Sequence, residues 1–210
     1  MEAGPLLAAA GGTRARLLEA AHDVTAESGY GAASVTAIAA RAGVATGTLY
    51  RHFPSKGHLF VDLFRRVCGG EIAAMQQAAD RPGATAGERI EEVLATFAAR
   101  ALQNPRLAWA LLAEPLDPLV EAERLAYRRT YRTLLAQLLR QAIDGGEIPD
   151  QDVEFTAAAV VGGVGEALVG PLSPLSGDAP PVADLLASLR RFVRGAIGAP
   201  PRPESDQEHR

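Results

Sequence analysis

The side chains best suited to bind a partner gather between Ser34 and Lys56, where the sequence reads SVTAIAARAGVATGTLYRHFPSK. Hydroxyls, a tyrosine, a histidine and cations occur there at short intervals. No Asp or Glu interrupts the wider span 28–61, although the formal net charge of the chain is −4 at pH 7. Hydrogen-bond donors and cations without competing carboxylates suit contact with a phosphate backbone. We therefore expect this segment to bind nucleic acid.

The apolar residues of this segment are spaced as in two short helices joined by a glycine turn. Ser34 is expected to cap the first helix, and Pro54 to stop the second, which is expected over 46–53. This arrangement predicts a helix-turn-helix, whose second helix enters the major groove of DNA. The alternatives are that Tyr50 belongs to the core and that His52 has no role. Ten residues are predicted to contact DNA. Most face outward on the second of these helices, and the others lie at helix starts or just after the N-terminal arm. They are Ser34, Thr36, Thr46, Gly47, Thr48, Tyr50, Arg51, His52, Lys56 and Arg14.

The distribution of charge along the chain agrees with an anion-binding N-terminal end. Residues 1–66 hold seven Lys and Arg against five Asp and Glu, whereas residues 67–210 hold fourteen against twenty. A local cationic excess in an acidic protein is typical of a surface that binds a polyanion. Random scatter of charge is the alternative interpretation.

The composition is that of a soluble globular protein. The 210 residues are 48% hydrophobic and 22% charged, enough for one or two small domains with a core. The single cysteine, Cys68, excludes an internal disulfide framework and fits a reducing compartment. The N-terminus lacks the pattern of a signal peptide, and the apolar run 157–165 is too short to span a membrane. We expect a cytoplasmic protein that does not enter a membrane.

The periodicity of apolar residues predicts an all-α fold with about nine helices. No segment shows the alternation typical of a strand, and Gly or Pro separates one helical pattern from the next. The helices are expected at 13–29, 35–42, 46–53, 56–79, 86–103, 105–113, 118–144, 151–170 and 183–197.

The segment resembles the DNA-binding signature of the TetR family of transcriptional regulators. The similarity covers about residues 13–62 and rests on Ser34-Val35, Ile38-Ala39, Ala42-Gly43-Val44, Gly47-Thr48-Leu49-Tyr50, His52-Phe53, Ser55-Lys56 and Leu59. Two positions depart from the family pattern. Ala45 stands where a capping serine is common, and Gly57 stands where the family often has an acidic residue.

The resemblance implies an all-α homodimer with a ligand-binding C-terminal part. The domain organisation then consists of an N-terminal helix-turn-helix domain and a larger C-terminal helical domain for ligand binding and dimerisation. The boundaries expected are a mobile arm at 1–12, the DNA-binding domain at 13–62, the C-terminal domain at 63–198 and a disordered tail at 199–210.

Two late helices have the composition of a dimer interface. Small residues recur on one face of the first, and an apolar stripe marks the second, so that two copies would form a four-helix bundle. The alternative is that these stripes belong to the core of one subunit. The predicted interface residues are Ala158, Val161, Gly162, Gly165, Val169, Leu185, Leu189, Phe192 and Val193.

The middle of the chain holds aromatic and bulky side chains that would suit an apolar pocket for a small molecule. A carboxylate within an apolar helix also needs a partner, which an arginine row at 124, 128 and 132 would supply. The alternative is that the aromatics are ordinary core and the arginines are solvated. The predicted ligand-binding residues are Phe97, Trp109, Leu112, Tyr127, Arg128, Tyr131, Phe155 and Glu166.

These observations predict a ligand-responsive DNA-binding regulator. It would bind a palindromic operator on double-stranded DNA as a homodimer, and a small hydrophobic or amphipathic effector would release it. Repression rather than activation is implied by the resemblance alone. A helical protein–protein adaptor is the alternative, and an enzyme is a weaker one, because no nucleophile elbow, zinc motif or Cys/His cluster occurs. No cofactor or metal is predicted.

Overall fold

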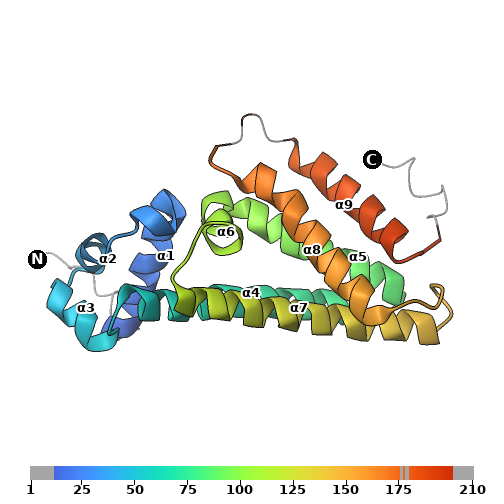
Figure 1. Cartoon of the computed structure of the whole chain (residues 1–210), viewed down its shortest axis with the longest axis horizontal. Helices are drawn as coiled ribbons and strands as arrows, with labels where there is room; N and C mark the ends of the chain where they lie inside the picture. The colour runs from blue at the N-terminus through green and yellow to red at the C-terminus, as the bar shows by residue number, and fades with distance from the viewer. Residues whose placement is uncertain (1–11, 176, 178–179, 201–210) are drawn as a thin grey trace, which may run out of the picture.

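A computed structural model describes residues 12–175, 177 and 180–200 (Figure 1). The expected mobile arm and most of the expected disordered tail lie outside these residues. The described part of the chain forms nine helices and no strand, which confirms the predicted all-α fold. The helices are α1 (Thr13–Ala32), α2 (Val35–Arg41), α3 (Thr46–His52), α4 (Lys56–Ala79), α5 (Ala86–Gln103), α6 (Pro105–Leu112), α7 (Pro118–Asp144), α8 (Val153–Leu172) and α9 (Val182–Ala196).

Side-chain caps explain most helix starts. The hydroxyl of Ser34 accepts a hydrogen bond from the Ala37 amide at 3.1 Å, and Ser55 caps α4 in the same way. Thr85 and Glu88 form a reciprocal capping box at α5. The predicted end of α1 at Gly29 is wrong, because helix resumes after a kink at which this glycine has a φ of 81°.

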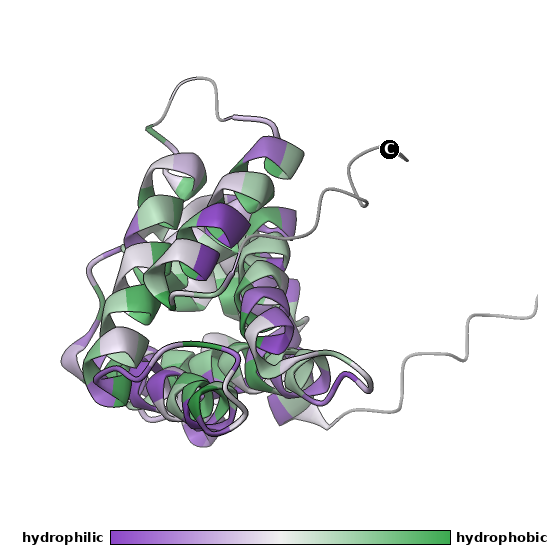
Figure 2. Ribbon diagram, turned by 90° about the vertical axis from the view of Figure 1, so that its right-hand side faces the viewer, coloured by the Kyte–Doolittle hydropathy of each residue, from purple (hydrophilic) through white to green (hydrophobic). Residues whose placement is uncertain are grey.

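The helix-turn-helix lies at one end of an elongated molecule, and α4 and α7 run side by side along its length (Figure 1). Helices α5, α6, α8 and α9 lie on one side of this pair. Hydrophobic and hydrophilic residues alternate along most helices (Figure 2), as expected of helices with one face packed on their neighbours.

Two apolar clusters divide the interior, but their border does not follow the expected boundary between residues 62 and 63. The first cluster joins α1–α3 and the first half of α4, and it also takes in Leu107, Leu111 and Val120 from α6 and α7. The second joins the end of α4 to α5, α7, α8 and α9. Helix α4 is continuous and contributes residues to both clusters.

Helix α8 has unusual composition for an outer helix. Its 20 residues include only two charged ones, Glu154 and Glu166, and the helix is long and apolar enough to cross a membrane, with a mean hydropathy of 1.5 over its best window. No other helix of the described residues passes this test. A core helix of a soluble protein has the same properties. One face of α8, with Ala157, Val160, Val164 and Leu168, packs in the second cluster, while other residues of the helix, among them Phe155, are exposed in the protomer.

We expect Gly57→Ala to destabilise the protein by about 1–3 kcal/mol through overpacking. A Cβ at Gly57 would lie 2.9 Å from the carboxyl carbon of Asp117, the residue that caps α7. Either the cap or the start of α4 must then move. Chemical denaturation of the variant measures the loss.

The matched control is Gly69→Ala, at a position on α4 where an added Cβ meets nothing within 4 Å. Alanine should raise helix stability at Gly69 by about 0.5–1 kcal/mol. Equal effects at both positions would contradict the contact with Asp117.

Candidate DNA interface and effector cavity

The helix-turn-helix presents α3 to solvent. Ile38, Leu49 and Phe53 are almost completely buried and hold α2 and α3 against α1 and α4. The turn between the helices passes through Gly43, whose φ of 66° suits glycine. No side chain caps α3, in agreement with Ala45 at its N-cap.

The outward face of α3 carries the side chains that sequence analysis predicted. Tyr50 is 50% exposed, so it does not belong to the core. Gly47 and His52 are exposed, and a Cβ at Gly47 would meet no atom within 4 Å. The Arg51 guanidinium donates to the Thr48 hydroxyl at 3.0 Å. Thr36 is exposed on α2, and Thr46 is partly exposed at the start of α3.

Three other residues predicted to contact DNA already have partners inside the protein. Ser34 caps α2. Arg14 donates to the carbonyl of His52 at 3.1 Å, forms an ion pair with Asp62 and lies over the ring of Phe53. Arg14 lies in α1, as expected, and ties this helix to α3.

Lys56 joins the start of α4 to the end of α1. Its ammonium donates to the Tyr30 carbonyl at 2.7 Å and lies 4.3 Å from the centroid of the Tyr30 ring. Burial is the main cause that lowers the pKa of Lys56. The side chain thus has a structural role in addition to its predicted phosphate contact.

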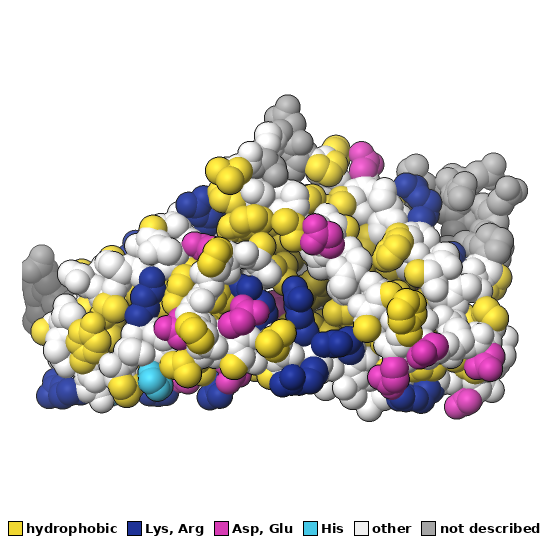
Figure 3. All heavy atoms as spheres, in the orientation of Figure 1, with side chains coloured by type: hydrophobic (Ala, Val, Ile, Leu, Met, Phe, Trp, Pro, Cys, Tyr) yellow, Lys and Arg dark blue, Asp and Glu magenta, His cyan; other side chains and the backbone are white. Residues whose placement is uncertain are grey.

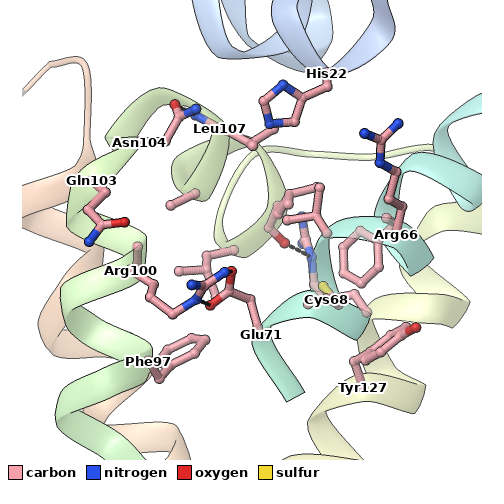
Figure 4. Close-up of a pocket in the computed structure, with 18 of the residues that line it drawn as sticks. His22, Arg66, Cys68, Glu71, Phe97, Arg100, Gln103, Asn104, Leu107 and Tyr127 are labelled. Atoms are coloured by element: carbon pink, nitrogen blue, oxygen red, sulfur yellow. Dashed lines mark hydrogen bonds and ion pairs between the residues drawn. The ribbon is translucent and has the colours of Figure 1, made fainter. Parts of the chain in front are cut away.

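A cavity of about 360 Å³ lies between α1, α4, α5, α6 and α7 (Figure 4). Its walls combine aromatic and aliphatic side chains with charged or polar groups from α1, α4, α5 and α7. The lining residues are Glu19, His22, Phe64, Arg66, Val67, Cys68, Gly70, Glu71, Phe97, Arg100, Ala101, Gln103, Asn104, Leu107, Ala108, Leu111, Leu112, Arg124, Tyr127, Arg128 and Tyr131. The volume falls within the range of about 300–1,000 Å³ that is usual for small-molecule sites.

Ion pairs hold most of the charged groups of this cavity. Arg100 contacts both carboxylate oxygens of Glu71, at 2.7 and 3.0 Å (Figure 4). Arg66 on α4 pairs with Glu19 on α1 at 2.7 Å. Arg124 donates to the carbonyls of Leu111 and Glu114, both at 2.8 Å. These pairs fix the walls and join α1 to α4 beside the cavity.

A second cavity of about 210 Å³ adjoins the first and shares Phe97, Leu112, Arg128 and Tyr131 with it. Its remaining walls come from α4, α5, α7 and α8: Met75, Leu94, Arg132, Ala158, Val161, Gly162, Val164 and Gly165. The rings of Phe97 and Tyr131, whose centroids are 5.6 Å apart, stand between the two cavities.

Comparison with known proteins agrees with this architecture. The profile of "Bacterial regulatory proteins, tetR family" matches residues 17–63, and that of "Tetracyclin repressor-like, C-terminal domain" matches residues 83–167. The chain belongs to the TetR family. The prediction of this family from residues 13–62 is confirmed.

Individual relatives of this TetR-family chain are transcriptional regulators. The transcriptional repressor KstR of Mycobacterium tuberculosis is 37% identical over 101 residues, which cover 47% of this chain and only 44% of KstR. The fatty acid metabolism regulator protein of Bacillus subtilis is 29% identical over 154 residues, covering 72% of this chain and 79% of that protein. A crystal structure of FadR from Bacillus subtilis with stearoyl-CoA has the same fold, with a TM-score of 0.74, 24% identity and coverage of 87% and 98% of the two chains.

The cavities of this TetR-family protein include five of the eight residues predicted to bind a ligand. Phe97, Leu112, Tyr127, Arg128 and Tyr131 line one or both of them. The other three line neither cavity. Trp109 packs against the second apolar cluster, and Phe155 and Glu166 are exposed, because both lie on the face of α8 opposite Val160 and Val164.

The residues that sequence analysis missed come mainly from α1, α4 and α6. Glu19 and His22 reach the cavity because α1 packs on α6, at a separation of about 85 residues in sequence that no local pattern reveals. The apolar side of α4 continues from Phe64 to Cys68, and this continuation could have indicated from the sequence that α4 lines the cavity.

The predicted dimer residues divide into two groups. Leu189 and Val193 are buried in the protomer itself, where α9 packs on α5, so the prediction of direct contact with a partner is wrong for them. Leu185 also packs against that core. Ala158, Val161, Gly162 and Gly165 line the second cavity, and Val169 is partly exposed. Phe192 is 49% exposed and covers Gly163, whose added Cβ would lie 3.0 Å from its ring.

We expect the stability of the protein to fall in alkali because of Cys68. Burial raises the pKa of this thiol from 9.0 to about 12, while the Tyr131 hydroxyl donates to its sulfur. Between about pH 9 and pH 12 the unfolded thiol loses its proton and the folded thiol keeps it, so deprotonation lowers the free energy of the unfolded state relative to the folded state. Urea denaturation across this pH range measures the effect.

The Cys68→Ala variant provides the control for this prediction. Its stability is lower at every pH, because a small cavity remains, but the part of the alkaline decline that Cys68 causes should disappear. An unchanged slope in the variant would contradict the assignment to Cys68.

Proposed function

We propose that this protein is a transcriptional repressor that binds a palindromic operator as a homodimer and releases it when an amphipathic small molecule occupies the cavity. The observation that carries this proposal is the position of the cavity. Helices α1 and α4 of the DNA-binding end form part of its wall, with Glu19, His22 and Arg66. An occupant therefore touches the same helices that hold α3.

The exposed face of α3 supports DNA binding. Thr48, Tyr50, Arg51 and His52 project from a seven-residue helix, within a span of the sequence, 28–61, that contains no Asp or Glu. A helix of this kind fits the major groove, and two such helices in a dimer must lie about 34–36 Å apart to reach successive grooves.

The surface of α8 and α9 supports a homodimer. Helix α8 is apolar, yet only part of it is buried in the protomer. Exposed Phe155, Val182 and Phe192 belong to these two helices. Covering apolar helices with their counterparts in a second copy would build the four-helix interface predicted above.

Contacts at the end of α6 offer a route from the cavity to the DNA-binding domain. The Glu114 carboxylate accepts hydrogen bonds from the amides of Tyr30 and Gly31, at 2.9 and 2.8 Å, and Arg106 donates to the Ser28 carbonyl at 3.2 Å. Leu107 and Leu111 of the same helix line the cavity. A ligand that prefers a displaced α6 would move α1 and thus lower the affinity for DNA.

A long-chain acyl compound is the first effector to test. The cavity offers aromatic and aliphatic walls together with charged or polar groups, and two relatives are a fatty acid metabolism regulator and a FadR crystallised with stearoyl-CoA. We infer that the protein acts in the cytoplasm, where DNA and such compounds meet.

Operator selection from random double-stranded DNA tests the proposal. The full chain should enrich a palindrome, bind it with an affinity that falls steeply with salt, and release it on addition of stearoyl-CoA. Absence of any enriched, salt-sensitive site would contradict DNA binding. Release that persists unchanged in a Glu114→Gln variant would contradict the route through α6 alone.

A further inference from the structure

We propose that Arg128 and Arg132 on α7 form an anion site at the second cavity, and that the effector must carry a carboxylate or phosphate group to bind there. This inference rests on the proposed function, because the ligand concerned is the effector. The anionic group would contact the two arginines while the apolar tail lies between the two cavities.

Some of the arginines that line the cavities already form ion pairs with carboxylates, and others do not. Arg66 and Arg100 form ion pairs with carboxylates, and Arg124 pairs with Glu121 and donates to two carbonyls. Within the described residues, neither Arg128 nor Arg132 forms an ion pair, and the two carboxylates that line the first cavity with Arg128, Glu19 and Glu71, are paired with Arg66 and Arg100. The Nε of Arg132 donates to the Arg128 carbonyl at 3.3 Å.

Arg128 is exposed and Arg132 is partly exposed, and no carboxylate faces either of them from the second cavity. Arg128 lines both cavities, and Arg132 lines the second. No Asp or Glu is among the described residues that line the second cavity, whose other walls are apolar. Lys and Arg side chains gather on the molecular surface where α7 passes below the gap between α6 and α8 (Figure 3).

The shape of the two cavities would orient the apolar tail of a bound effector. Phe97, Leu112 and Tyr131 border both cavities, so an apolar chain that begins at Arg128 can continue along these side chains into the larger space. Gly162 and Gly165 of α8 leave the second cavity open, since an added Cβ at either would meet nothing within 4 Å. A guanidinium binds a carboxylate or a phosphate through two parallel hydrogen bonds, and an apolar environment strengthens them.

Calorimetric titration of the DNA-free protein with three twelve-carbon probes tests the proposal. Dodecanoate carries a carboxylate, dodecanoyl-CoA carries phosphates, and dodecanol is neutral. We expect the anionic effector to bind at least about tenfold more tightly than dodecanol. The tighter of the two anionic probes identifies the source of the anion.

Substitutions on α7 distinguish a specific anion contact from a general effect of the positive charge on this helix. Arg128→Gln and Arg132→Gln should each weaken the anionic probe about tenfold without changing dodecanol, and Arg128→Lys should restore part of the loss. Arg129→Gln is the matched control, because Arg129 is an exposed arginine on the same helix that lines neither cavity.

Equal binding of charged and neutral probes, or equal losses for the Arg128 and Arg129 variants, would overturn the anion site. Operator binding without ligand is measured separately on the same preparations. If the protein binds the operator but binds anionic and neutral probes equally, the proposed anion site is wrong and the proposed repressor function remains. If operator binding is absent in the unmodified protein, the proposed function itself fails.

Discussion

Replacing Gly47 with glutamate is expected to lower the affinity for operator DNA at least about 100-fold, because the new carboxylate would face phosphates or base edges from the middle of α3. The substitution fits the fold. A Cβ at Gly47 meets no atom within 4 Å, and its φ lies outside the left-handed region that favours glycine. Glutamate is also a better helix former than glycine by about 0.5–1 kcal/mol. The variant should therefore be folded, slightly more stable and unable to bind the operator in a mobility-shift assay.

Gly69→Glu is the matched control for this experiment. Gly69 lies on α4, is exposed and leaves the same open space for a Cβ, so the substitution adds the same charge to a helix outside the predicted DNA face. Its operator affinity should stay within about threefold of the unmodified protein, since a distant charge acts only through the screened field. Comparable losses in both variants would show that net charge, rather than the α3 face, governs binding.

Replacing Arg194 with glutamine should produce the largest loss of stability, about 3 kcal/mol, because it removes the cation beside a buried carboxylate. Glu91 on α5 is only 1% exposed, and Arg194 on α9 forms an ion pair with it. Denaturation at fixed protein concentration measures the loss. A change of this size lowers the melting temperature by about 6–12 °C for a chain of this length.

Arg190→Gln tests whether burial is the cause. Arg190 also connects α9 to α5, through an ion pair with Glu92 at 3.0 Å, but both side chains are about one-third exposed. Its loss should be below about 1 kcal/mol. The double variant Glu91→Leu with Arg194→Met should recover most of the stability, because an apolar pair avoids the cost of burying charge. Failure of this recovery would mean that Arg194 stabilises α9 by some means other than this pair.

Local patterns in the sequence were sufficient to predict the DNA-binding end. Ser34, Gly43 and Pro54 mark the bounds of α2 and α3, and Ile38 and Leu49 pack across a turn only a few residues long. Each of these effects depends on neighbours within one or two helical turns, which the order of residues specifies directly. The same reasoning correctly placed Tyr127, Arg128 and Tyr131 together, because they share one face of α7.

Prediction failed where a helix is apolar on more than one side. Helix α8 carries Ala, Val and Gly around most of its circumference, so periodicity does not show which face is inward. Phe155 and Glu166 were expected in the pocket and lie on the opposite face. On α9 the apolar stripe was real, but the structure uses Leu189 and Val193 to pack against α5 within the protomer.

The sequence by itself therefore determined the all-α class, the helix-turn-helix and the family, because these follow from local spacing and caps. Only the tertiary structure decided that Glu19 and His22 of α1 line the same cavity as Tyr131 of α7, and that Arg14 and Lys56 hold helices together. Contacts of this kind depend on how helices that are far apart in the sequence pack against each other. They place the cavity proposed for the effector against α1 and α4, which hold α3.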